Sequence, residues 1–432
     1  MKTAIQHIQA RRIWDSRGRP TVEVDVYLQD GSTGRGVAPA GASRGSREAL
    51  ELRDGGPLLG GLDVSQAVAN VNSEIAQALH GLDALDQAGA DKVLIELDGT
   101  PLKSRLGANA MIATSLAIAQ AAAVSQALPL WRYLSNGQAV SLPLPQIQIF
   151  GGGAHAGRRV DIQDFLVMPL GAQSFDEALV MVANVYHAAG RLMEQRGKRA
   201  GVADEGGWWP DFSSNEEALQ TLTLAIETAG YRHDQVGIAV DVAASEFGSN
   251  GQYTLGLDKH VYSTEEWMAV LLRWVNTYPI ISVEDPFAED DTAGMQAFTQ
   301  AMGERIQVIG DDYLVTSVAL IEAAVRDKAC NAVLLKPNQV GTLTETYQAM
   351  LSARGAGMGM VVSARSGETE DTAIVHLATG WNTGQLKVGS FARSERMAKW
   401  NEALRIESSA AFTGGFAGTQ GLAPLGSRKT SG

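Results

Sequence analysis

Apolar and acidic residues alternate along segment 21–28, where valines at every second position are separated by Glu23 and Asp25. A period of two is typical of a strand with one buried face, so we predict a half-buried strand here. The Asp30-Gly31 pair that follows has the turn chemistry of a hairpin. From about residue 65 to residue 134 the pattern is helical, and prolines at positions 143 and 145 mark a boundary near residue 140. Residues 1–138 are therefore predicted to form a small N-terminal α+β domain.

Short apolar runs recur along the rest of the chain, and each ends in a polar residue followed by helix-like sequence. These polar residues are Asp241, Glu284, Asp311, Lys336, Ser363 and Lys387. Their spacing of roughly 25 to 45 residues is the length of a βα unit, so residues 139–408 are predicted to form an α/β fold, a (β/α) barrel. In such barrels the active site lies at the carboxyl ends of the strands. We therefore expect the three carboxylates and two lysines to converge.

Two further segments bear on the class of protein. The stretch 106–130 has no charged residue, but it is rich in alanine and carries Asn, Thr, Ser and Gln. A buried helix fits this composition better than a membrane span. Residues 409–432 are dominated by Gly, Ser and Thr without a regular period, so we predict a loosely attached or disordered C-terminal tail.

Composition and charge narrow the possible partners. The 432-residue chain has a net charge of −13, which argues against nucleic acid or an anionic membrane as a general partner. One cysteine excludes a disulfide scaffold and any CxxC motif. The first eighteen residues contain no seven-residue apolar run, so no signal peptide is expected and the protein is predicted to be cytoplasmic.

Three carboxylates that meet at one barrel rim would repel one another and raise their own pKa values. Oxygen ligands without His or Cys favour Mg²⁺ over zinc, so we predict a Mg²⁺ site at Asp241, Glu284 and Asp311. For any single strand-end Asp, a helix cap or a surface ion pair remains the alternative. A lysine desolvated near this cation, such as Lys336 after its apolar run, can act as a general base, and the alternative is a lysine that extends to solvent.

Long motifs that contain these residues resemble the enolase (phosphopyruvate hydratase) family over about residues 1–408. The motifs are DSRGRPTVEV, GASRGSREALELRDG, IELDGT, KSRLGANA, ADEGGW, DVAASEF, SVEDPFAEDD, NQVGTLTET, RSGETED and RSERMAKWNEALRIE. The resemblance implies an enolase-type modified (β/α)8 barrel with an N-terminal capping domain, and an assembly of two or more copies. It also implies a small anionic substrate and Mg²⁺ at one tight site, with a second ion on substrate binding.

Residue by residue, the resemblance assigns a role to each matching position. Asp241, Glu284 and Asp311 match the ligands of the tight Mg²⁺, and Ser43 matches a ligand of the second. Lys336 matches the base that removes the C2 proton, Lys387 the lysine that binds the substrate carboxylate, and Glu205 the acid that assists departure of the C3 hydroxyl. Arg365 and Ser366 match the phosphate-binding pair, and a guanidinium fork beside a hydroxyl suits phosphate oxygens. His155 and Gln163 match residues of a second lid and of the carboxylate neighbourhood.

Several positions depart from the family pattern, mainly in the loops that carry Ser43 and His155 and next to the other predicted substrate-binding residues. Ala364 replaces a substrate-contacting histidine, and Asp164 replaces a glutamate of the catalytic carboxylate group. The other changes are Arg44 for a threonine, Gly151 for an asparagine, Arg158 and Arg159 for Asp and Asn, Pro337 after the base lysine, and Trp208-Trp209 for Phe-Ala. The added arginines Arg44 and Arg158 are predicted to contact substrate.

Three functions fit these observations. The departures favour an enolase-family enzyme that forms or uses a phosphoenolpyruvate-like compound and is specialised to a phosphonate substrate. Such a protein would be similar to the carboxyphosphonoenolpyruvate synthases of antibiotic biosynthesis. The first alternative is an ordinary glycolytic enolase, which converts 2-phosphoglycerate to phosphoenolpyruvate. The second is a non-catalytic structural or surface-binding protein on the same scaffold.

Overall fold

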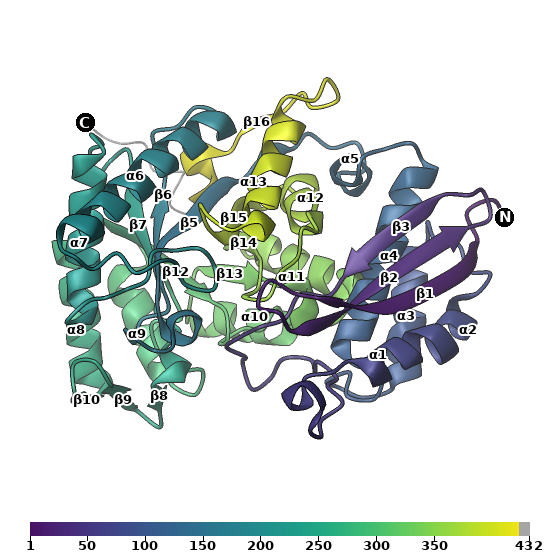
Figure 1. The fold of residues 1–432 in the computed structure, drawn as a ribbon, viewed down its shortest axis with the longest axis horizontal. Coiled ribbons are helices and arrows are strands. Elements are labelled where there is room, and N and C mark those ends of the chain that lie inside the picture. Colours follow the sequence, from purple (N-terminus) through teal and green to yellow (C-terminus); the bar gives the residue numbers. More distant parts are fainter. Residues whose placement is uncertain (423–432) are drawn as a thin grey trace.

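The computed structural model describes residues 1–422 and divides into a sheet-and-helix part and a barrel (Figure 1). The N-terminal sheet is antiparallel, with the order β1 (Ile5–Trp14), β2 (Pro20–Leu28) and β3 (Thr33–Val37). The hairpin expected at Asp30-Gly31 joins β2 to β3. The helices of this part are α1 (Ser65–Asn70), α2 (Ala76–Leu79), α3 (Gln87–Asp98), α4 (Ala108–Ser125) and α5 (Leu130–Leu134), with a π-helical turn at Val71–Ile75 between α1 and α2.

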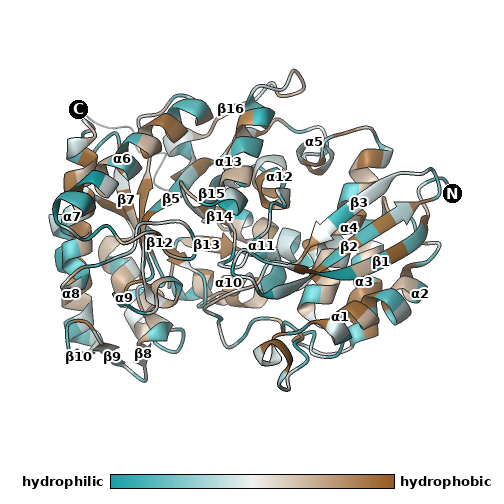
Figure 2. Ribbon diagram, in the orientation of Figure 1, coloured by the Kyte–Doolittle hydropathy of each residue, from teal (hydrophilic) through white to brown (hydrophobic). Residues whose placement is uncertain are grey.

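The central strand β2 is buried more completely than its alternating pattern predicts. Its valines face the helices, but Asp25 on the opposite face is also buried. Arg11 and Arg35 from the flanking strands form ion pairs with Asp25 and cover it. Figure 2 shows the resulting hydrophobic and hydrophilic bands along β1–β3.

Helix α4 packs directly on β3 through small residues. A Cβ atom added at Gly34 or Gly36 would overlap the backbone of α4 at Ala121, Ala117 or Ala113, so only glycine allows this close approach. Helix α4 is long and apolar enough to cross a membrane by length and composition, but 83% of its 18-residue window is buried inside the protein. It is the buried alanine-rich helix that the sequence predicts.

The second part is a closed barrel of eight strands surrounded by helices (Figure 1). In spatial order the strands are β11 (Ile280–Glu284), β12 (Gln307–Gly310), β13 (Ala332–Leu335), β14 (Gly359–Ser363), β15 (Gly384–Ser390), β5 (Leu144–Gly151), β6 (Asp164–Met168) and β7 (Gly237–Asp241). Strand β6 runs antiparallel to both of its neighbours, and the other neighbouring pairs are parallel. The six strands expected from the apolar runs are β7 and β11–β15, whereas β5 and β6 were not predicted.

The helices of this part are α6 (Phe175–Gln195), α7 (Asn215–Thr228), α8 (Thr264–Thr277), α9 (Thr292–Met302), α10 (Val318–Asp327), α11 (Leu343–Gly355), α12 (Ala373–Gly380) and α13 (Ser394–Glu407). Side-chain hydroxyls begin four of them. Ser174, Ser214, Ser263 and Thr342 each accept a hydrogen bond from the third residue of the following helix. A small sheet of β8 (Gly248–Ser249), β9 (Gln252–Leu255) and β10 (His260–Ser263) extends from the barrel after β7.

The chain after α13 packs on the barrel, so the prediction of a loosely attached tail is wrong for residues 409–422. Strand β16 (Gly415–Phe416) pairs with β4 (Ser141–Leu142), and the ring of Phe412 lies 5.7 Å from that of Trp131. The Gln385 side chain donates a hydrogen bond to the carbonyl of Gly421 at 2.9 Å, and Leu422 is 6% exposed. Residues 423–432 of the expected tail lie outside the described residues.

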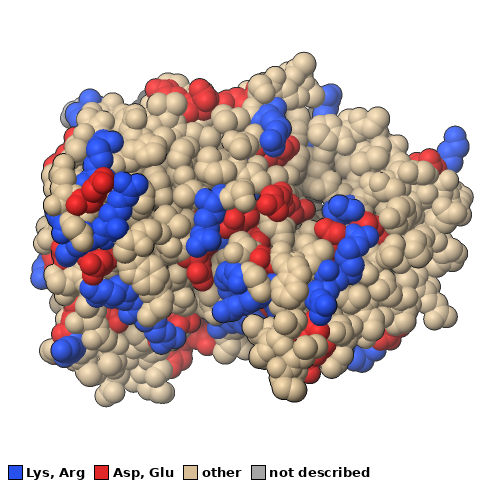
Figure 3. All heavy atoms as spheres, viewed as in Figure 1, with Lys and Arg blue, Asp and Glu red and all other residues tan. Residues whose placement is uncertain are grey.

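On the face shown in Figure 3, the charged residues do not separate into large patches of one sign. Figure 3 shows Lys and Arg interspersed with Asp and Glu across the face that contains the junction of the two parts.

Candidate active site

Carboxylates and lysines from opposite strands meet at the carboxyl rim of the barrel. Asp241 ends β7 and Glu284 ends β11, two parallel neighbours whose register places these residues side by side. Lys387 extends from β15 on the other side of the barrel. Its Nζ donates to Asp241 Oδ2 at 2.7 Å and to Glu284 Oε2 at 2.8 Å, and lies 3.5 Å from Asp164 Oδ2. The structure thus brings together these predicted residues.

Asp311 and Lys336 form a second buried pair at the same rim. The ammonium group of Lys336, directly after β13, donates to Asp311 Oδ2. The side-chain amide of Gln339 donates to the other oxygen, Oδ1, at 2.9 Å. Burial opposes ionisation of Asp311, but the charge of Lys336 holds the pKa of this carboxyl below its usual value. Burial also acts to lower the pKa of Lys336, and the carboxylate of Asp311 raises it above the usual lysine value.

The side chain of Glu284 gives the strongest indication of a metal site. Burial, and then the neighbouring charge of Asp241, raise the pKa of Glu284 well above its usual value. Its Oε1 atom is buried and has no hydrogen-bond partner within the described part of the chain, and the same holds for Gln163 Oε1 nearby. Buried oxygens without a donor are costly unless a cation satisfies them, so this donor set fits a hard divalent ion.

Two further carboxylates, Asp285 and Asp312, lie close to Asp311 and were missed by the sequence reasoning. Ligand oxygens of these three residues all lie within 4.8 Å of one another. Asp285 accepts backbone hydrogen bonds from Asp311 at 2.9 Å and from Asp312 at 2.7 Å, and so it shapes the turn after β12. Burial, and then the charge of Asp311, raise the pKa of Asp285 to about 8. The only sequence signal was that each follows a predicted ligand directly, in SVED and GDD.

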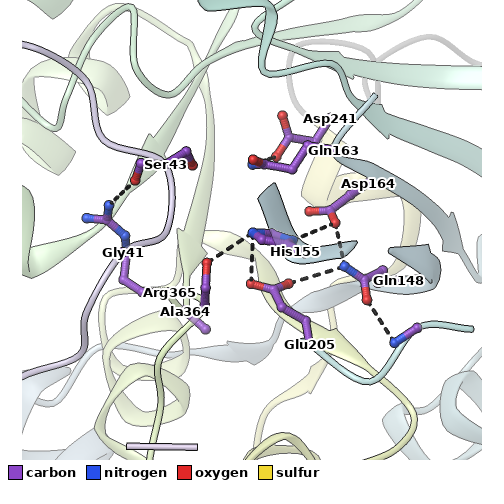
Figure 4. A network of polar contacts seen from close by, with 12 residues as sticks. Gly41, Ser43, Gln148, His155, Gln163, Asp164, Glu205, Asp241, Ala364 and Arg365 are labelled. Atoms are coloured by element: carbon purple, nitrogen blue, oxygen red, sulfur yellow. Dashed lines mark hydrogen bonds and ion pairs between the residues drawn. The ribbon is translucent and has the colours of Figure 1, made fainter. Parts of the chain in front are cut away.

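His155 links the acidic residues at the centre of the site (Figure 4). Its Nδ1 lies 3.2 Å from Asp164 Oδ1, and its Nε2 lies 3.0 Å from Ser366 Oγ and 3.8 Å from Glu205 Oε1. Burial alone would lower the pKa of His155, but the charges of Glu205 and Asp164 raise it to about 9. Burial likewise opposes the charge of Asp164, and His155 lowers the pKa of that carboxyl to about 2. The two side chains therefore form a charged pair.

Arg365 connects the barrel to the loop that carries Ser43. Its Nη1 donates to Glu48 Oε2 at 2.9 Å, and its Nη2 donates to Glu48 Oε1 at 3.2 Å and to the carbonyl of Ser43 at 3.0 Å. Glu48 was not among the predicted site residues. The loop that carries Ser43 is attached to the barrel where it begins, because the backbones of Ala40 and Gly367 exchange hydrogen bonds of 2.9 and 2.8 Å.

The predicted residues around this cluster line one cavity at the barrel mouth. The cavity has a volume of about 20 Å³, and its walls include Ala364 and Val388. The predicted residues that line it are Ser43, His155, Gln163, Asp164, Glu205, Asp241, Lys336, Arg365, Ser366 and Lys387. Loss of a histidine at position 364 has therefore left no large void.

The added arginines do not reach this cavity. Arg44 forms an ion pair with Glu51, and Arg158 pairs with Glu246 at 2.7 Å. Arg159 pairs with Asp211 on the same side of the barrel mouth. In this structure the charges of Arg44 and Arg158 are therefore balanced by acidic neighbours outside the cavity, and their contact with the substrate stays a prediction.

Trp208 also points away from the cavity. Its ring stacks on Tyr186 at 4.8 Å, the guanidinium carbon of Arg199 lies 4.7 Å from the ring centre, and its Nε1 donates to the carbonyl of Tyr186. Its backbone N–H donates to Ile149 in β5. The tryptophan therefore anchors the loop of Glu205 to the outside of the barrel.

Comparison with known proteins covers both parts of the chain. Residues 5–134 match the family described as "Enolase, N-terminal domain", and residues 139–424 match "Enolase, C-terminal TIM barrel domain". A relative named "Enolase 1", from Desulfitobacterium hafniense (strain Y51), is 52% identical over 407 residues, which is 93% of this chain and 93% of that protein.

Proposed function

The chain belongs to the enolase family, and we propose on this premise that it catalyses the reversible dehydration of 2-phosphoglycerate to phosphoenolpyruvate and water. The family consists of magnesium-dependent lyases that act on a small phospho-carboxylate. The observation that carries the proposal is the buried cluster of Asp241, Glu284 and Asp311 facing Lys336 and Lys387 across the barrel mouth.

Two observations favour the ordinary reaction over a phosphonate-specific one. The relative named Enolase 1 is 52% identical to this chain over 407 residues. The added arginines, which suggested a more anionic substrate, are paired with Glu51 and Glu246 outside the cavity. Arg365 remains the cation suited to a single phosphate, together with the hydroxyl of Ser366 and the imidazole of His155.

Asp241, Glu284 and Asp311 would hold Mg²⁺, and Ser43 would contribute to a second ion. When bound, the Mg²⁺ at the three carboxylates would offset their negative charge and stabilise the negative charge that develops on the substrate carboxylate. The Oε1 atoms of Gln163 and Glu284 are buried without a hydrogen-bond partner among the described residues, so each could accept a cation or one of its water ligands.

The protein groups divide the proton transfers of the elimination between them. Lys336 accepts the C2 proton as base once its ammonium group, which donates to Asp311 in this structure, has given up its own proton, and Lys387 holds the substrate carboxylate. The C3–O bond breaks, and Glu205 delivers a proton to the departing hydroxyl, which leaves as water. His155 and Asp164 fix the edge of the cavity on which Glu205 lies. The Ser43 segment excludes water when it closes over the substrate.

A spectrophotometric assay of phosphoenolpyruvate formation tests this proposal. Purified protein with Mg²⁺ should convert 2-phosphoglycerate at the rate of an ordinary enolase, and chelation with EDTA should abolish turnover. Lys336→Ala should lower kcat roughly 10²- to 10⁴-fold, the usual contribution of a general base.

A panel of phosphonates followed by phosphorus NMR separates the alternatives. Turnover of a phosphonate without turnover of 2-phosphoglycerate would contradict the proposed reaction and favour the specialised enzyme. A folded protein that turns over neither would favour a non-catalytic role.

A further inference from the structure

Gln148 is a buried side chain of β5 that joins two of the candidate catalytic carboxylates. It is fully buried, and its Nε2 donates to Asp164 Oδ1 and, at 3.4 Å, to Glu205 Oε2. Its Oε1 accepts a hydrogen bond from the backbone N–H of Gly207 at 2.9 Å. One amide group thus contacts strand β6 and the loop that carries Glu205 (Figure 4).

The orientation of this amide is fixed by its partners. The backbone N–H of Gly207 can only donate, so the amide oxygen must face it. The NH₂ group must then face the carboxylates of Asp164 and Glu205, which suit its two donor hydrogens. The hydroxyl of Ser390 donates to the carbonyl of Gln148 and holds the backbone as well. An amide with its oxygen and nitrogen exchanged would therefore not satisfy the same groups.

Two departures from the family pattern meet at Gln148. Asp164 is one methylene shorter than the usual glutamate, and the amide of Gln148 contacts the withdrawn carboxylate. At Gly151, which stands in place of an asparagine, an added Cβ would lie 3.1 Å from Gln148 Oε1 and 2.8 Å from the Cβ of Ala203. A longer side chain at either position would therefore crowd the amide.

We propose that Gln148 is a positioning residue, matched in length to Asp164, that holds the carboxylates of Asp164 and Glu205 in their reactive arrangement. This inference rests on the proposed dehydration. Gln148 does not line the cavity, so we expect it to make no contact with a substrate bound there. It acts by engaging Oε2 of Glu205, so that Oε1, 3.8 Å from His155 Nε2, is the oxygen left to serve the departing hydroxyl.

Shortening the side chain at position 148 by one methylene and lengthening that at position 164 by one methylene tests whether the two lengths are matched. Gln148→Asn leaves a gap beside Asp164, and Asp164→Glu overfills the contact. Each single variant should lower kcat for 2-phosphoglycerate about 10- to 100-fold, the effect of losing one hydrogen bond to a buried charge. The KM should change less than about threefold, because neither change removes a substrate contact. The double variant, with the total length restored, should recover to within roughly fivefold of the wild-type kcat.

Gln146→Asn is the matched control. Gln146 is also buried in β5, two residues away, but donates to Gln385 at 2.9 Å and does not line the cavity. This variant should keep the wild-type kcat. Urea unfolding of every variant gives the folded fraction under assay conditions.

The outcomes distinguish failure of this inference from failure of the proposed function. If the wild type does not dehydrate 2-phosphoglycerate, the proposed function is wrong. If the wild type is active but the double variant is no faster than the slower single variant, the matched-length proposal is wrong. A loss of kcat that only follows the folded fraction, or that equals the loss in Gln146→Asn, also overturns it.

Discussion

Replacing Lys387 by methionine removes one positive charge from the middle of the acidic cluster and keeps the length of the side chain. The ammonium group contacts Asp241 at 2.7 Å and Glu284 at 2.8 Å, and these side chains are 3% exposed against 7% for Lys387. Removing one partner of a buried ion pair costs about 3–5 kcal/mol, because the other charge is left buried and unpaired. The two contacts share one ammonium group and do not add, so we expect Lys387→Met to lower the free energy of unfolding by about 3–5 kcal/mol without metal.

Mg²⁺ should restore much of this loss, because it gives Asp241 and Glu284 a cation again. In the wild type the same ion must first displace the ammonium group from both carboxylates. Excess ligand that binds only the folded state stabilises it by about 2.7 kcal/mol at a concentration of 100 Kd. We therefore expect Mg²⁺ to stabilise the variant more than the wild type.

Urea unfolding followed by tryptophan fluorescence, in EDTA and in millimolar Mg²⁺, measures both effects. Lys103→Met is the matched control, because Lys103 is equally buried but pairs at 2.9 Å with the more exposed Glu345, outside the cluster. It should lose less stability and show no added response to Mg²⁺. The reasoning is refuted if Lys387→Met loses less than about 1 kcal/mol in EDTA, or if its loss is the same with and without Mg²⁺.

Three more predictions concern pH, the arginines and the C-terminal segment. The pKa of His155 is raised from 6.5 to about 9, so its charged form stabilises the fold fully below pH 6.5, and this contribution is lost as the pH rises through about 9. Urea midpoints of His155→Gln should therefore fall less than those of the wild type over this range, and parallel curves would contradict the assignment. Arg44→Ala and Arg158→Ala should each change kcat/KM for 2-phosphoglycerate less than about threefold, because exposed ion pairs contribute little, and a tenfold rise in KM would place them at the substrate. Leu422→Ala should lower the free energy of unfolding by about 2–3 kcal/mol in the same urea assay, whereas no change would mean that the segment does not pack on the barrel.

The strand-end residues could be predicted because each one depends on a short local pattern and on a simple property of parallel barrels. An apolar run followed by Asp241, Glu284 or Lys336 defines a strand and its carboxyl end, and the barrel brings these ends to one rim. The N-terminal hairpin and the helical region follow from periodicity in the same way. Strand β6 was not predicted because it runs antiparallel to its neighbours and does not belong to a repeating βα unit.

What could not be predicted depends on contacts between distant segments. Nothing near Arg158 in the sequence indicates that its charge is balanced by Glu246, and the role of Gln148 appears only when β5, β6 and the Glu205 loop are brought together. The C-terminal segment has a composition typical of disorder, yet a few apolar side chains such as Leu422 are enough to attach it to the barrel. Composition reports the average of a segment, whereas packing depends on individual positions.

The close contact of Gly34 and Gly36 with helix α4 has a mechanical consequence for the Ser43 segment. The helix contributes only backbone atoms at Gly34, and backbone atoms with the Cβ of Leu116 at Gly36, so no change of rotamer at this contact can absorb a displacement. The backbone bonds between Ala40 and Gly367, and from Ala49 to the carbonyl of Gln339, clamp both ends of the following loop. Residues 41–48 therefore form a short loop that is fixed at both ends. If Ser43 moves on substrate binding, as proposed above, the movement would have to take place within this loop.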